Sequence, residues 1–164
     1  MRAGAPLAAL LLAACSGGDA PNTQQPQDLE SAAIERGLVG DPTARDIAGV
    51  YARDTDRVCI VPQGEGYRIG VQVDYGDGNV CTASGTLDRS GTRLRVRLGL
   101  GEVCRFTARI EGETIRFPGA LPDRCKSFCR GRATLTAIHA ARMSDSAAEA
   151  AAVRDAAGRQ LCGG

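Results

Sequence analysis

The segment Thr92-Arg-Leu-Arg-Val-Arg-Leu98 decides the fold class, because its side chains alternate between apolar and charged. Leu94, Val96 and Leu98 fall on one face of an extended chain, and the arginines fall on the other. Successive side chains of a β-strand point to opposite faces of its sheet, so this alternation indicates a strand with one buried and one solvated face. Half-buried strands of this kind are typical of antiparallel sheets. The segment therefore predicts an antiparallel sheet.

The same period of two recurs on both sides of this segment, in Tyr67-Arg-Ile-Gly-Val-Gln-Val73 and in Cys104-Arg-Phe-Thr-Ala-Arg-Ile110. Glycine-rich turn signals such as Gly76-Asp-Gly-Asn79 and Ser90-Gly91 separate the alternating runs at intervals of about 8 to 12 residues, which is typical of a meander, sandwich or barrel. We expect a mainly β fold, an antiparallel meander of about eight strands that forms a small barrel or a curled sheet. The expected strands cover residues 48–53, 57–62, 66–74, 80–88, 92–98, 102–110, 113–117 and 131–138.

Two short helices are expected to flank the strands. Asp28 can cap a helix that runs to about residue 36, with Gly37 as its stop. Ser146-Ala-Ala-Glu149 has the form of a capping box and predicts an Ala-rich helix to about residue 157.

The first fifteen residues indicate export. Arg2 precedes an apolar run over residues 3–14, which is too short for the ~20 residues that a membrane-spanning helix needs and is typical of a signal peptide. The run ends in Leu12-Ala13-Ala14-Cys15, which resembles the lipobox of bacterial lipoproteins. This resemblance implies a lipoprotein signal peptide over residues 1–14, a lipidated Cys15, a flexible tether over 15–27 and a folded domain over 28–164.

The same resemblance predicts where the protein resides. Several acyl chains on Cys15 would give lasting membrane anchorage, whereas a single chain is marginal. Ser16 follows the cysteine, and the Asp that often marks retention in the inner membrane does not stand there. We therefore expect lipid anchorage in the cell envelope, at the periplasmic face of the outer membrane.

The remaining cysteines predict disulfide bonds. Setting Cys15 aside leaves six of the seven cysteines, and an even number in an exported chain indicates a disulfide framework. Six thiols allow 15 pairings, among which sequence alone does not choose. We favour Cys81 with Cys104, Cys125 with Cys129 and Cys59 with Cys162. The spacing offers neither paired C-x-x-C motifs nor histidine partners, so we expect no metal and no cofactor.

Composition narrows the function classes further. The net charge is +1, from 20 basic and 19 acidic residues, which argues against nucleic acid as a partner. His139 is the single histidine, and this removes most nucleophilic and multi-histidine metal chemistry. We therefore expect a protein that is not an enzyme.

Arginine is unevenly placed along the predicted strands. The outward positions of three strands carry a set of arginines that would form a basic face if those strands are neighbours, and guanidinium groups bind phosphate and carboxylate well. An anionic lipid or protein is the partner that this face predicts. The candidates are Arg68, Arg93, Arg95, Arg97, Arg105 and Arg109.

The segments 48–59 and 125–133 together resemble small lipoproteins of Gram-negative bacteria that have no assigned activity. Gly49-Val50-Tyr51 also resembles the Gly-x-Trp opening of lipocalin-like barrels, with Tyr in place of Trp. We expect a non-enzymatic binding or structural module. One alternative is an inhibitor of a protease or lysozyme that presents the loop 118–130, and another is a carrier of a small apolar ligand.

Overall fold

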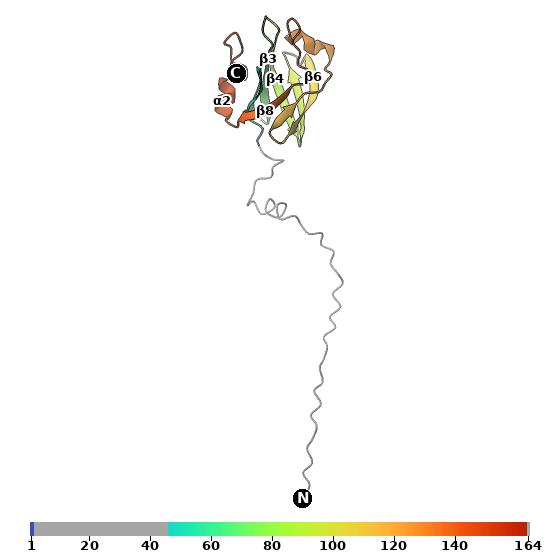
Figure 1. The fold of residues 1–164 in the computed structure, drawn as a ribbon, viewed down its shortest axis with the longest axis vertical. Coiled ribbons are helices and arrows are strands. Elements are labelled where there is room, and N and C mark those ends of the chain that lie inside the picture. The colour runs from blue at the N-terminus through green and yellow to red at the C-terminus, as the bar shows by residue number, and fades with distance from the viewer. Residues whose placement is uncertain (2–45, 164) are drawn as a thin grey trace. The chain divides into compact units, whose positions relative to one another are not determined.

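The computed structural model describes residues 46–163, together with Met1. The expected signal peptide, the tether and the helix over 28–36 lie outside the described barrel residues. Eight antiparallel strands form a closed barrel in which each strand pairs with the next and β8 pairs with β1 (Figure 1). The strands are β1 Gly49–Arg53, β2 Asp56–Gln63, β3 Gly66–Asp74, β4 Val80–Ser90, β5 Arg93–Leu98, β6 Cys104–Glu111, β7 Thr114–Arg116 and β8 His139–Ser144.

The mainly β prediction is confirmed, and the barrel is closed rather than a curled open sheet. Seven of the eight strands lie within about two residues of their predicted positions. Their side chains also alternate as predicted. In β5, for example, Leu94, Val96 and Leu98 point into the core, and Arg93 and Arg95 are exposed.

The eighth strand was predicted wrongly over residues 131–138. Ala133 and Leu135 do alternate as buried residues, but they pack over one end of the barrel instead of extending a strand. Thr134 and Thr136 hydrogen-bond each other locally, and Ala137 has a positive φ of 55°, which interrupts an extended chain. The strand begins only at His139, directly after the predicted strand 131–138 ends.

Apolar side chains occupy the interior of the barrel. An eight-stranded barrel is just wide enough for side chains to fill. Tyr51 is the largest fully buried side chain, and its hydroxyl donates to the carbonyl of Ile47 at 2.9 Å and accepts a hydrogen bond from Arg142. Residues from all eight strands join one apolar cluster, among them Val58, Ile69, Leu87, Leu94, Ala108, Ile115 and Ala140.

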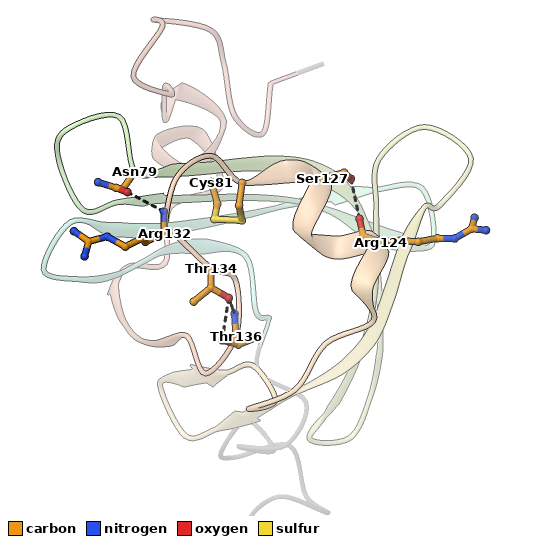
Figure 2. The surroundings of a disulfide bond; sticks show 8 residues. Asn79, Cys81, Arg124, Ser127, Arg132, Thr134 and Thr136 are labelled. Atoms are coloured by element: carbon orange, nitrogen blue, oxygen red, sulfur yellow. Dashed lines mark hydrogen bonds between the residues drawn. A yellow bond between two sulfur atoms is a disulfide. The ribbon is translucent and has the colours of Figure 1, made fainter.

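An end cap, residues 117–138, closes one end of this interior. It contains the 3-10 helix η1, Asp123–Phe128, and two disulfides fasten it to the barrel. Figure 2 shows the one at Cys81. Cys125 is bonded to Cys104 of β6, and Cys129 is bonded to Cys81 of β4. The amide of Arg132 also donates to the side chain of Asn79 at 2.8 Å, as Figure 2 shows.

These bonds correct two of the favoured pairings. Cys81 and Cys104 both face inward, as expected, but β5 lies between their strands, and each bonds to the end cap that passes over it. The expected bond between Cys125 and Cys129 is therefore wrong. The pairing of Cys59 with Cys162 is confirmed.

A C-terminal layer, residues 147–163, covers the outside of β1, β2 and β3. It begins with α2, Ala147–Ala152, where Ser146 accepts a hydrogen bond from the amide of Glu149 as the capping motif predicted. The helix is shorter than expected, and the chain then continues to Cys162. Leu161 packs directly on Gly70, where a Cβ would lie only 2.5 Å from the Leu161 carbonyl oxygen. Ala150, Leu161 and the Cys59–Cys162 bond form a second small apolar cluster.

The three disulfides should differ in their contribution to stability. They close chain segments of 103, 48 and 21 residues, and the loss of unfolded-state entropy is about 4.7 kcal/mol for a ~100-residue loop but about 3 kcal/mol for a ~15-residue loop. Replacing Cys59 and Cys162 together by Ala should therefore lower the free energy of unfolding more than replacing Cys104 and Cys125. Equilibrium unfolding in urea measures both. An equal or smaller loss for the Cys59–Cys162 pair would contradict the chain-entropy argument.

Candidate anion-binding face

The outer surfaces of β5, β6 and β7 carry a basic face. The strand register places Arg93 directly opposite Arg109, and Arg97 directly opposite Arg105. Arg109 in turn lies opposite Arg116 on β7. The structure thus brings together five of the six predicted arginines and adds one. We call this set the arginine face: Arg93, Arg95, Arg97, Arg105, Arg109 and Arg116.

Like charges placed directly opposite each other on neighbouring strands are destabilising. Three carboxylates relieve part of this repulsion. Glu102 contacts Arg97 at 3.1 Å and Arg105 at 2.6 Å, while Glu111 contacts Arg116 at 2.9 Å. The third is Asp88 on β4, which contacts Arg97 at 2.7 Å. Six guanidinium groups therefore share three carboxylates, and the face keeps a positive excess.

The arginines of the face differ in how firmly they are held. Arg97 donates to Asp88, contacts Glu102, and has only 26% of its side chain exposed. This hydrogen bond from Arg97 holds the pKa of Asp88 below its ordinary value of 3.8, with smaller contributions from the charges of Arg97 and Arg95. Arg93 and Arg95 are exposed, and no carboxylate among the described residues forms an ion pair with either. They are the arginines best placed to meet an outside anion.

Arg68 does not join the face. It lies on β3, opposite Thr86 of β4, which is itself opposite Arg97 of β5. Its guanidinium donates to the carbonyl of Gly163 at 3.0 Å, so it holds the C-terminal layer. Sequence placed it on the outward side of its strand correctly, but sequence could not show that β4 separates it from the arginines of β5 and that it contacts the C-terminal layer instead.

Arg116 was missed although the expected strand 113–117 places it outward, since Ile115 and Phe117 on either side of it are apolar and buried. The tight turn after β6 was a second signal that could have located Arg116. Glu111 and Thr114 flank a tight turn, so the chain must return beside β6 and bring Arg116 next to Arg109.

The predicted inhibitory loop, residues 118–130, belongs to the end cap. Disulfides hold it at Cys125 and Cys129, while Arg124 and Arg130 are exposed at its surface. In Figure 2 the side chain of Arg124 extends away from the disulfide. The loop is therefore a fixed part of the barrel end.

Other chemistry has little support within the described residues. In residues 46–163 no three His, Cys, Asp or Glu side chains gather where they could hold a metal ion. None of the helices described there is long and apolar enough to cross a membrane. Two pockets larger than the ~300 Å³ that a small ligand needs are open to solvent. One of about 560 Å³ lies at the end of β8, beside Asp46 and Glu113, and one of about 640 Å³ lies along β4.

Comparison with known proteins adds no relative. No protein-family model matches the chain, and no curated protein and no solved structure matches it.

The repulsion within the arginine face should be measurable in the stability of the free protein. Arg93→Glu places a carboxylate opposite Arg109, and we expect it to raise the free energy of unfolding by about 0.2–1 kcal/mol at low salt. Arg97→Glu is the matched variant on the same strand face. It should lower stability, because it removes the partner of Asp88 and Glu102.

Urea unfolding at about 10 mM and 500 mM salt tests both variants. The gain from Arg93→Glu should shrink at high salt, because salt screens exposed charges. A loss of stability in both variants would show that Arg93 is already compensated in the free protein.

Proposed function

We propose that the protein is a lipid-anchored module of the cell envelope, at the periplasmic face of the outer membrane, that binds an anionic partner without catalysis. The observation that carries this proposal is the arginine face, in which like charges lie opposite each other across three adjacent strands. A partner with phosphate or carboxylate groups would supply the charges that the fold itself does not.

The chemistry of the face favours binding over catalysis. A guanidinium group stays protonated at all physiological pH values, so it holds and orients an anion but does not exchange protons with it. Its planar donors match the oxygens of phosphate and carboxylate. A face built almost wholly from this group is therefore suited to recognition.

The disulfides support the proposed location. All six cysteines of the described residues are bonded to one another, so none of them is a partner for Cys15. Disulfides persist in oxidising compartments such as the periplasm. Lipidation requires a free thiol at the end of the apolar leader. Because the other six cysteines are bonded to one another, they leave the thiol of Cys15 without a disulfide partner in the chain.

Inhibition of a hydrolase is a second candidate function, favoured by the rigidity of the end cap. Two disulfides within five residues fix its backbone, and fixing a binding loop in advance lowers the entropy lost on association. In this case the partner would contact Arg124 and Arg130 of the end cap instead of the arginine face.

Lipidation can be tested directly on Cys15. When the full chain is expressed in a Gram-negative host with labelled palmitate, we expect label on the protein and partition into detergent. Cys15→Ser should abolish both, while the barrel keeps its three disulfides. An unmodified Cys15 thiol on a chain that retains its leader would contradict the anchor.

Anion binding can be tested with a charge reversal. Arg93→Glu with Arg95→Glu should weaken association with tetraglutamate, a short soluble polyanion, by at least tenfold at low salt. Arg124→Glu with Arg130→Glu is the matched control, because it changes the net charge equally on the exposed end cap. Calorimetry measures both. An equal loss of tetraglutamate affinity in the two variants would show that only net charge matters. A loss only in the control variant would indicate that the anion binds at the end cap.

A further inference from the structure

A groove lies beside the arginine face, between the outer surface of β4 and the C-terminal layer. Its volume is about 640 Å³, which falls within the range of ~300–1,000 Å³ found for small-ligand sites. β4 is the longest strand of the barrel, and its outward side chains form the floor. These are the hydroxyl residues Thr82, Ser84 and Thr86.

The groove exists because the outward side chains at its floor on β4 are small, whereas the C-terminal layer and the end cap beside them project further from the barrel. On one side the C-terminal layer ends over β3, with Leu161 and Gln160 at the groove. At the end cap, the ring of Phe128 lies over Gly99, where a Cβ would approach the ring to 2.6 Å. Phe128 and the 97% exposed Leu100 form an apolar end to an otherwise polar groove.

Two arginines border the side formed by β3 and the C-terminal layer. Arg68 uses one nitrogen for the carbonyl of Gly163. Arg159 contacts the buried carboxylate of Asp155 at 2.8 Å, but 75% of its side chain remains exposed. Burial raises the pKa of Asp155, yet hydrogen bonds from the Arg159 backbone and side chain outweigh it, so the pKa lies below its ordinary value of 3.8. Asp155 therefore stays charged and holds Arg159 at the groove.

The structure restricts what can occupy this groove. β4 is paired on both sides, with β3 and β5, so no peptide can add to it as a further strand. An apolar occupant would cover the three floor hydroxyls without giving them partners, which is unfavourable. Hydroxyls and amides both donate and accept hydrogen bonds, so a ligand rich in hydroxyl groups matches the floor.

We propose that the groove binds an acidic oligosaccharide. Sugar hydroxyls meet Thr82, Ser84 and Thr86, and the carboxylate or phosphate groups of the sugar meet Arg68 and Arg159. An apolar ring face packs on Phe128. The inference rests on the proposed anion-binding function, because Arg97 donates to Thr86 at 3.2 Å and thereby joins the groove to the arginine face.

The test uses the full-length protein in detergent micelles and tetragalacturonate as the acidic sugar, with calorimetry as the measurement. Maltotetraose supplies hydroxyls without charge, and tetraglutamate supplies charge without sugar hydroxyls. We expect tetragalacturonate to bind at least tenfold more tightly than either. Equal binding of tetraglutamate, or no binding of tetragalacturonate, would overturn the inference.

Two variants locate the binding. Ser84→Trp should fill the groove and weaken tetragalacturonate binding at least tenfold, whereas Ala141→Trp, on an exposed outward position of β8, should not. Thr82→Val with Ser84→Ala removes hydroxyls with little change of volume and should weaken it several-fold, with Thr107→Val on β6 as its control. Unfolding curves show whether each variant is folded.

The two proposals fail in different ways. If the groove variants bind tetragalacturonate as the unchanged protein does, but Arg93→Glu with Arg95→Glu weakens tetraglutamate binding, the groove is wrong and the arginine face stands. If tetraglutamate binding is also unaffected by the charge reversal, the proposed anion-binding function fails as well.

Discussion

The pairing of β8 with β1 is the constraint on which the rest of the structure depends. It closes the ring, so every strand has one side in the core and the other on the outer wall. The wall is then divided by strand. The C-terminal layer covers β1 to β3, the groove follows β4, and arginines occupy β5 to β7. Closure therefore turns a linear order of strands into a fixed order of surfaces, with the groove and the arginine face as neighbours.

The fold could be predicted from sequence wherever a strand had to alternate. Leu94 and Arg95 show this on β5, because one faces the core and the other faces solvent. The prediction of the eighth strand failed because alternating buried residues also occur in the end cap, which is not a strand. Ala133 and Leu135 are buried in the end cap, and no periodicity distinguishes a strand from a loop that packs over a barrel end. The cysteine pairing failed for the same reason, since it depends on where that loop lies.

The candidate site could be predicted only in part. Outward positions can be read along one strand, so five arginines of the face were found. Their spacing across strands depends on register, which sequence does not contain. Register makes Arg93 and Arg109 direct neighbours and leaves Arg68 with the C-terminal layer. The groove could not be predicted, because it arises from the height difference between the small side chains of β4 and the C-terminal layer beside them.

Stability explains how the barrel can keep an unfavourable surface. Each of the three opposed arginine pairs costs on the order of 0.2–1 kcal/mol, less the relief from Glu102 and Glu111. Each disulfide supplies about 3 to 4.7 kcal/mol by restricting the unfolded chain, depending on the length of the loop that it closes. The bonds therefore exceed the repulsion, and they stabilise the end cap and the C-terminal layer without touching β5 or β7. Because stability comes from elsewhere, the outer surfaces of these strands are free to be selected for binding.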